Sequence, residues 1–292
     1  MYVSVRNGMV SKGSTESPAA LMRKMGIDAV EINLAQDFQV AAMDSHDMVV
    51  LANDADVDAY KKRLENVGIH ACGLLTARDF SGGDMDASIA WLARSIEIAD
   101  RLGATCVRID SAMSKERELD FGTRVDMFAK GLKGALDRTS GSKVTLGIEN
   151  HGYQGNNLAF LLNVFEEVGS DRLGSTMDVG NFYWRGYPLS EVYGILRILA
   201  PHTKHTHIKN IKYPEDQREV TREAGWEYTT YMCPIAQGDI DVMRVAQLLK
   251  NVGYTGDLCL EDESLERYEG DERLKYLEED VEHLKKIAAA IG

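Results

Sequence analysis

The sequence of 292 residues has little proline, little cysteine and no long apolar run. Its five prolines are scattered and no segment is of low complexity, which argues against a disordered linker and marks no domain boundary. No stretch approaches the roughly 18 to 20 continuous apolar residues of a membrane span. The first ten residues carry Arg6 and Asn7 where a signal peptide would need an apolar run. We therefore expect a cytoplasmic protein.

The four cysteines contain no C-x-x-C pair, which favours a reducing compartment over a disulfide framework. A positive charge balance is also lacking, since the net charge is -13. Nucleic-acid binding depends on a basic face, so a nucleic-acid partner is disfavoured, although a locally positive cleft is not excluded. Neither G-x-G-x-x-G nor G-x-x-x-x-G-K-[ST] occurs, which removes the usual signs of a nucleotide-binding open sheet.

Short apolar runs alternate with helical patterns from end to end. Such alternation predicts parallel strands covered by helices. The eight strands are expected at 2–5, 27–34, 69–75, 105–110, 144–148, 173–178, 201–208 and 257–261. The helices that follow them are expected at 18–25, 54–67, 85–102, 115–138, 157–168, 189–199, 239–252 and 271–290. Eight units in a chain of this length predict an α/β fold, a single (β/α)8 TIM barrel domain over residues 1–292.

Four of these strands end on acidic or imidazole side chains. The strand at 144–148 runs into Glu149, Asn150 and His151, and the next one ends at Asp178. The last two run into His207 and Glu261. The ends of parallel barrel strands converge on one cleft, so these groups are expected to meet there. A helix cap or a loop is the plainer interpretation of each acid alone, but recurrence on four consecutive strands favours a site.

Three carboxylates and one imidazole suit a hard divalent cation. The ligand set suits Mn²⁺ or Mg²⁺, with Co²⁺ or Zn²⁺ as alternatives. His205 and His207 are two residues apart and share one strand face, so either could supply the nitrogen.

At these residues the sequence resembles the sugar isomerase/epimerase group of xylose-isomerase-like TIM barrels. The segments that carry the resemblance are Gly147–His151, Met177–Asn181, His205–Lys209 and Leu260–Glu263, with lesser matches at Val30–Glu31 and Gly238–Asp241. The resemblance selects His207 and implies a divalent metal, most often Mn²⁺, held by Glu149, Asp178, His207 and Glu261. It also implies that Glu149 and Glu261 flank the substrate and move its proton.

The resemblance implies a divalent-metal-dependent isomerase or epimerase of a keto-sugar or sugar derivative. A metal-stabilised enediolate would form between the two glutamates. Related ketose 3-epimerases have a histidine where Asn181 stands, and hydroxypyruvate isomerases have a proline where Asn150 stands. The identity of the sugar, and whether it is phosphorylated, stays open.

Four further residues are candidates for substrate contact: His151, Asn181, Lys209 and Trp226. His151 could equally be a loop histidine, and Lys209 could equally reach solvent. Trp226 lies in the long segment 210–238, which we interpret as a lid whose tryptophan stacks on a sugar face. A packing cluster or a subunit contact is the alternative. Arg108 and Asp110 are expected to form an internal ion pair.

Three other functions stay open. A lyase or dehydratase acting on a keto-sugar or cyclitol could use the same acids for β-elimination. A metal-dependent DNA-repair nuclease would need more metal ligands than seven histidines suggest and a less acidic chain. A non-catalytic subunit with a residual site is the third. The expected partners are a small sugar and a second copy in a homodimer, without nucleic acid or membrane.

Overall fold

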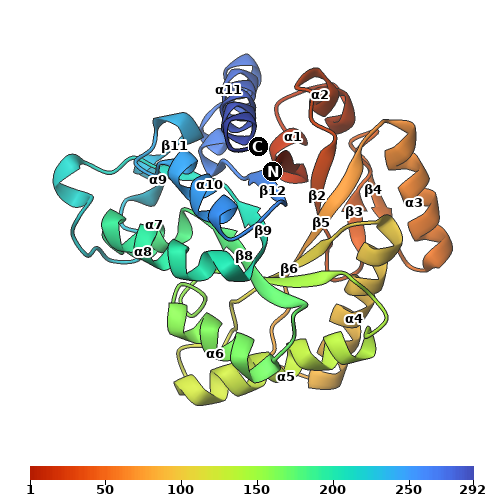
Figure 1. The fold of residues 1–292 in the computed structure, drawn as a ribbon. Helices are drawn as coiled ribbons and strands as arrows, with labels where there is room; N and C mark the ends of the chain where they lie inside the picture. Colours follow the sequence, from red (N-terminus) through yellow and green to blue (C-terminus); the bar gives the residue numbers. More distant parts are fainter.

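A ring of eight parallel strands forms the centre of the computed structural model, which describes residues 1–292 (Figure 1). The strands are β1 (Tyr2–Arg6), β2 (Ala29–Asn33), β5 (His70–Thr76), β6 (Cys106–Asp110), β7 (Thr145–Glu149), β8 (Leu173–Asp178), β9 (Thr203–His207) and β12 (Asp257–Leu260). They are hydrogen-bonded in the order β12-β1-β2-β5-β6-β7-β8-β9. One parallel bridge, between Ile208 and Leu260, completes the ring. The predicted TIM barrel is confirmed.

Eight helices surround the ring and cover its outer face (Figure 1). They are α2 (Pro18–Lys24), α3 (Asp54–Asn66), α4 (Met85–Leu102), α5 (Phe121–Arg138), α6 (Leu158–Val168), α8 (Leu189–Leu199), α10 (Val242–Asn251) and α11 (Gly270–Ile291). Three short helices, α1 (Asn7–Val10), α7 (Asn181–Arg185) and α9 (Tyr228–Tyr231), lie in the segments that follow strands. No helix qualifies as a membrane span.

Local signals in the sequence explain where the helices begin and end. The Asn53 side chain accepts from the backbone N–H groups of Ala55 and Asp56, so a capping box starts α3. Gly103 ends α4 with a φ of 86°, a left-handed conformation that glycine adopts without strain. The expected helices at 85–102 and 189–199 have these bounds in the structure.

Two connections differ from the expectation. The helix expected at 115–138 begins only at Phe121, because the Asp120 carboxylate caps it by accepting from the backbone N–H of Thr123 at 2.9 Å. The segment between β2 and α3, for which no strand was predicted, contains a short antiparallel hairpin of β3 (Gln39–Ala41) and β4 (Met48–Val50).

The long segment 210–238 is folded onto the barrel. Its strand β10 (Asn210–Ile211) pairs with β11 (Met232–Cys233), and short 3-10 helices η2 (Glu215–Gln217) and η3 (Ile235–Gln237) complete it. Two further 3-10 helices occur elsewhere, η1 (Ala200–His202) and η4 (Glu263–Arg267). The guanidinium of buried Arg222 lies 4.2 Å from the ring centre of Tyr213 and also donates to backbone carbonyls. Cation–π contact and hydrogen bonds thus hold the segment in one conformation.

The interior of the barrel is polar as well as apolar. His205 on β9 reaches across the barrel, with its Nε2 3.1 Å from Glu31 Oε1 and its Nδ1 3.0 Å from Asp257 Oδ1. Bulky branched side chains usually fill this space.

A buried pair of carboxyl groups attaches the long segment to the last helix. Asp280 on α11 accepts from the backbone N–H of Ile235 at 2.7 Å, and its carboxyl group lies beside that of Asp262, which follows β12. Burial and the neighbouring Asp262 charge raise the pKa of Asp280 to about 9. The two groups therefore share a proton at neutral pH.

Replacing this proton-sharing pair should change how stability depends on pH. An unfolded aspartate ionises near pH 4, whereas folded Asp280 holds its proton to about pH 9. The free energy of unfolding should therefore fall as pH rises through this window. In Asp280→Asn the amide oxygen still accepts from Ile235, so urea denaturation should show the difference in unfolding free energy between pH 5 and pH 8 reduced by up to about 4 kcal/mol. The exposed control Asp171→Asn should keep the pH dependence of the unmodified protein. The same dependence in Asp280→Asn would contradict a proton shared between Asp280 and Asp262.

Candidate active site

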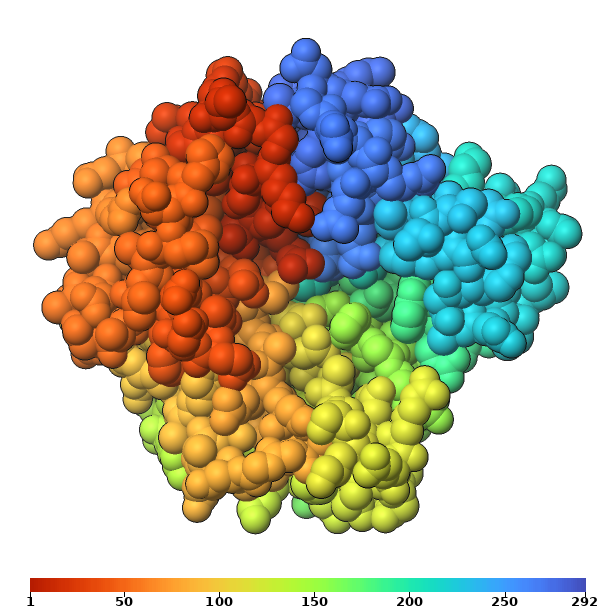
Figure 2. Space-filling model, turned by 180° about the vertical axis from the view of Figure 1, so that it is seen from behind, coloured from red at the N-terminus to blue at the C-terminus, as the bar shows by residue number.

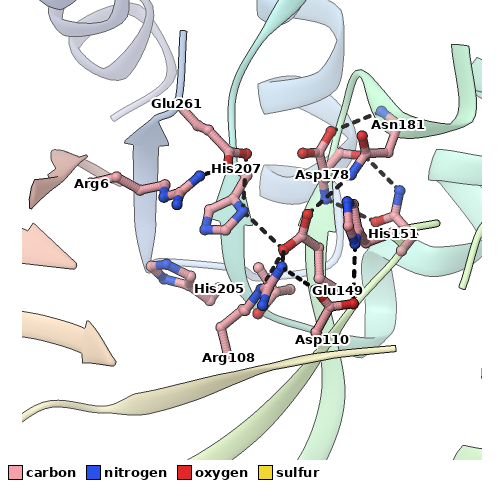
Figure 3. Close-up of polar contacts among 12 residues, drawn as sticks. Arg6, Arg108, Asp110, Glu149, His151, Asp178, Asn181, His205, His207 and Glu261 are labelled. Carbon is pink, nitrogen blue, oxygen red and sulfur yellow. Dashed lines mark hydrogen bonds and ion pairs between the residues drawn. The ribbon is translucent and has the colours of Figure 1, made fainter. Parts of the chain in front are cut away.

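The carboxyl ends of four strands bring Glu149, Asp178, His207 and Glu261 together, as the strand order predicts (Figure 3). Each offers one ligand atom, and these four atoms lie within 4.8 Å of one another. All four residues are buried. Glu149, Asp178 and His207 end β7, β8 and β9, and Glu261 follows β12 directly.

Backbone and side-chain contacts fix the strand ends relative to one another. Asp178 and His207 are register partners of neighbouring strands. Asn150 exchanges two hydrogen bonds with the Asp178 backbone: its Oδ1 accepts from the N–H and its Nδ2 donates to the carbonyl oxygen, both at 2.9 Å. Asp178 Oδ1 accepts from the N–H groups of Gly180 and Asn181 at 2.8 Å each. The other oxygen, Oδ2, stays directed to the cluster.

The cluster fits a divalent cation by its unsatisfied atoms. Asp178 Oδ2, Glu261 Oε2 and His207 Nδ1 are buried and have no hydrogen-bond partner. Lys209 and the neighbouring members of the cluster lie at ion-pair distance from them, but without hydrogen-bond alignment. Leaving buried polar atoms unpaired costs about 1–3 kcal/mol each, so the convergence of these three atoms suits a shared cation. Three carboxylates and one imidazole are ligands for Mn²⁺, Mg²⁺, Co²⁺ or Zn²⁺.

Three cations offset the negative charge of the cluster. Arg6 pairs with Glu261 and Arg108 with Glu149 (Figure 3). Lys209 Nζ lies 3.0 Å from Asp178 Oδ2. Arg108 Nη2 is also 3.4 Å from Asp110 Oδ2, so the predicted ion pair exists beside a stronger one to Glu149. Arg6, at the end of β1, was not predicted as a site residue. Its position at the end of β1 is the sequence feature from which a place in the site could have been predicted.

Glu31 on β2 was also missed as part of the site. Its Oε2 lies 2.9 Å from His207 Nε2, which leaves Nδ1 facing Glu149 and Glu261. A carboxylate on one imidazole nitrogen sets the tautomer and orientation of a metal-binding histidine. The signal was a lone carboxylate within an otherwise apolar, fully buried stretch of β2. Together with His205 and Cys259, Glu31 and His207 form a second buried group whose potential ligand atoms lie within 4.8 Å of one another.

The charges of the cluster are coupled. Burial alone would raise the pKa of Glu149, but Arg108 and His207 outweigh it and hold that pKa well below its ordinary value. For Asp178 burial prevails over Lys209 and raises the pKa. Burial would lower the pKa of His207, yet Glu31 and Glu149 raise it. Glu149 is thus a carboxylate at neutral pH.

The four residues predicted to contact substrate lie in different surroundings. Asn181 Nδ2 donates to Glu149 Oε1 at 3.0 Å, and Lys209 bridges Asp178 and Glu263. His151 Nδ1 is 3.1 Å from Asp110 Oδ1, and the side chain is 46% exposed. The hydrogen bond to Asp110 raises the pKa of this imidazole and outweighs burial, which would lower it.

Trp226, the fourth of these residues, packs in an aromatic cluster. Its ring lies 5.6 Å from that of Tyr231 and 5.7 Å from that of Tyr213. Tyr228 is the residue of this segment that contacts the site, because its hydroxyl donates to Glu263 at 2.5 Å. Stacking of Trp226 on a sugar stays a prediction.

The face above the cluster is hollowed between loops that are far apart in the sequence (Figure 2). A cavity of about 430 Å³ lies to one side, between the segments that follow β2, β5 and β6; its lining includes Gln36, Arg78, Asp79 and Asp110 but none of the four clustered residues. Asp110 connects this cavity to Glu149 through Arg108. The cavity offers donors and acceptors to a polar molecule.

Comparison with known proteins identifies the family. The model of a family described as xylose isomerase-like TIM barrel matches residues 19–287. A search of curated proteins found no match.

Solved structures share the fold at low identity. A protein described as IOLI with a bound zinc atom has a TM-score of 0.71 at 17% identity, covering 100% of this chain and 98% of that one. An L-ribulose 3-epimerase has a TM-score of 0.70 at 17% identity, covering 100% and 96%. A probable 3-DHS dehydratase, AsbF, from Bacillus anthracis has a TM-score of 0.64 at 12% identity, covering 98% and 99%.

Removing the Glu31 carboxylate should weaken metal binding without removing a ligand. In Glu31→Gln the amide can still contact His207, but it no longer favours the orientation and basicity of that imidazole. We expect Mn²⁺ affinity to fall about 10- to 100-fold, measured by isothermal titration calorimetry. Glu65→Gln, an exposed substitution with the same charge change, should bind as the unmodified protein does. Equal affinity in the two variants would show that Glu31 does not orient His207.

Proposed function

Because the chain belongs to the xylose isomerase-like TIM barrel family, we propose that it is a divalent-metal-dependent isomerase or epimerase of a keto-sugar or sugar derivative. The observation that supports this most is the buried cluster of Glu149, Asp178, His207 and Glu261 at the strand ends. Two of its carboxylates, Glu149 and Glu261, come from strands separated by β8 and β9. They therefore approach a bound molecule from different sides.

Glu149, Asp178, His207 and Glu261 would hold the metal, with Mn²⁺ as the first candidate and Mg²⁺, Co²⁺ or Zn²⁺ as alternatives. When bound, such an ion polarises a carbonyl group and stabilises the negative charge that develops on its oxygen. Glu31 keeps His207 oriented for this role. Arg6 and Arg108 keep the two glutamates in place by ion pairs.

The glutamates supply the acid–base chemistry. Glu149, ionised beside Arg108, accepts the proton from the carbon next to the carbonyl, and Glu261 delivers one from the other side; the roles reverse for the reverse reaction. Return of the proton to the same carbon inverts that centre. Return to the neighbouring carbon moves the carbonyl. Burial of both carboxylates excludes water from the transfer.

A metal-dependent lyase or dehydratase acting on a keto-sugar or cyclitol is the second candidate. The same proton removal expels a leaving group when one lies β to the carbon that loses its proton. The shared fold of the dehydratase AsbF supports it as an alternative. Appearance of an enone absorbance in the product would distinguish elimination from isomerisation. The cytoplasmic location, the homodimer and the lack of a nucleic-acid partner stay predictions.

The response of the deuterium-uptake rate to added Mn²⁺ should distinguish residues that transfer the proton, Glu149 and Glu261, from a residue that only binds the metal. With Mn²⁺ and a panel of keto-sugars in heavy water, the unmodified protein should place deuterium beside the carbonyl, detected by mass spectrometry. Glu149→Gln and Glu261→Gln should lower this rate by about 10²- to 10⁴-fold even at saturating metal. Asp178→Asn should recover as Mn²⁺ is raised, because Asp178 is proposed to bind only the ion.

Two results would count against the assignment. Full recovery of both glutamate variants at high Mn²⁺ would reduce these residues to ligands. Absence of deuterium uptake across the panel, with metal content verified, would remove the isomerase and epimerase proposal. Glu166→Gln, exposed on α6, is the matched control and should leave the rate unchanged.

A further inference from the structure

Two arginines and a tyrosine lie together on the rim of the candidate active site. Arg117 comes from the segment between β6 and α5, Tyr153 from the segment between β7 and α6, and Arg185 from the end of α7 after β8. The guanidinium carbons lie 4.8 Å (Arg117) and 5.4 Å (Arg185) from the centre of the Tyr153 ring. Three successive strands thus contribute one cluster at the carboxyl-end face.

Apart from the contacts with Tyr153, these two guanidinium groups have no partner in the protein. Neither forms an ion pair or a hydrogen bond, although acidic residues outnumber basic ones, 46 to 33. Glu116, next to Arg117 in the sequence, instead accepts from the backbone N–H of Gln154 at 3.3 Å. By contrast, the inner cations Arg6, Arg108 and Lys209 are each paired with carboxylates. The outer pair therefore keeps its full set of donors available.

The position of the pair relative to Glu149 suits the far end of a short sugar. Asn181 contacts Glu149, and Arg185 lies four residues further along α7, on the same helix face and about 6 Å along its axis. His151, two residues before Tyr153, is half-exposed on the same side. Figure 2 shows the yellow and green segments of this region bordering the central hollow. A molecule held at the cluster can therefore extend toward the two arginines.

We propose that Arg117 and Arg185 form a subsite for an anionic group, a phosphate monoester or a carboxylate, at the end of the substrate opposite its carbonyl. The inference rests on the proposed function for the location of that carbonyl. Planar guanidinium groups bind phosphate and carboxylate oxygens through two N–H donors each. Each guanidinium group contacts the Tyr153 ring by a cation–π interaction, so part of its side-chain entropy is already lost before the anion binds.

The test compares three ketoses that differ only at carbon six: D-fructose, D-fructose 6-phosphate and D-fructuronate. Their affinities for the Mn²⁺-loaded protein are measured by calorimetry at low ionic strength, together with inorganic phosphate as a competitor. The variants are Arg117→Gln, Arg185→Gln and the double substitution. Arg197→Gln is the matched control, because Arg197 is exposed near the end of α8 and has no ion pair.

We expect an anionic ketose to bind at least about tenfold more tightly than D-fructose, and the double variant to lose this preference while keeping its affinity for D-fructose. Arg197→Gln should keep the preference. Tighter binding of only the phosphate or only the carboxylate identifies which anion the subsite takes. Equal affinity for all three ketoses, or a preference that survives the double substitution, overturns the proposal. So does failure of both anionic ketoses and of inorganic phosphate to bind in an arginine-dependent way.

Deuterium uptake on the same ketoses keeps this inference separate from the proposed function. Arginine-dependent binding of an anion without deuterium uptake would support the subsite and count against the isomerase. Uptake from subsaturating D-fructose 6-phosphate and D-fructuronate that is indifferent to the two arginines would support the isomerase and remove the subsite.

Discussion

The compensation of buried negative charge is the constraint on which the centre of this protein depends. Glu31, Glu149, Asp178 and Glu261 are nearly or fully inaccessible to solvent and lie close together at one end of the barrel. Buried carboxylates are costly unless they are paired, and breaking one such pair typically costs about 3–5 kcal/mol. Arg6, Arg108 and Lys209 supply the pairing from three further positions on the strand ring. Even so, Asp178 Oδ2 and Glu261 Oε2 remain without a hydrogen bond, and this residual demand is what points to a cation.

The polar interior extends this constraint into the barrel. Glu31 contacts both His205 and His207, and Asp257 contacts His205 from the other side. The contact of Glu31 with His207 Nε2 leaves His207 Nδ1 directed toward Glu149 and Glu261. The arrangement is consistent with the proposed chemistry, in which Glu31 would orient the imidazole and Glu149, Asp178 and Glu261 would provide the ligand oxygens, with the two glutamates also transferring the proton.

The order of the strands could be predicted because barrel geometry is regular. The strand ends predicted Glu149, Asp178 and Glu261, and the resemblance selected His207 over His205. The structure brings these four residues together. Glu31 and Arg6 were missed because their partners are far away in the sequence; Glu31 is 176 residues from His207. Arg108 was paired with its neighbour Asp110, whereas its main partner, Glu149, is 41 residues away. Sequence spacing reveals contacts within an element, but not which side chain faces another across the barrel.

The sequence by itself determined the alternation of strands and helices, the polar strand ends and the donor types available to a cation. These follow from local propensity, helix caps and the two-residue period of a strand, which depend on neighbours in the chain. Only the tertiary structure decided which nitrogen of His207 faces the cluster, which cations are already paired, and that Arg117 and Arg185 are not. It also placed Tyr228 rather than Trp226 against Glu263. Such outcomes depend on distances between side chains brought together by closure of the barrel, and no local pattern encodes them.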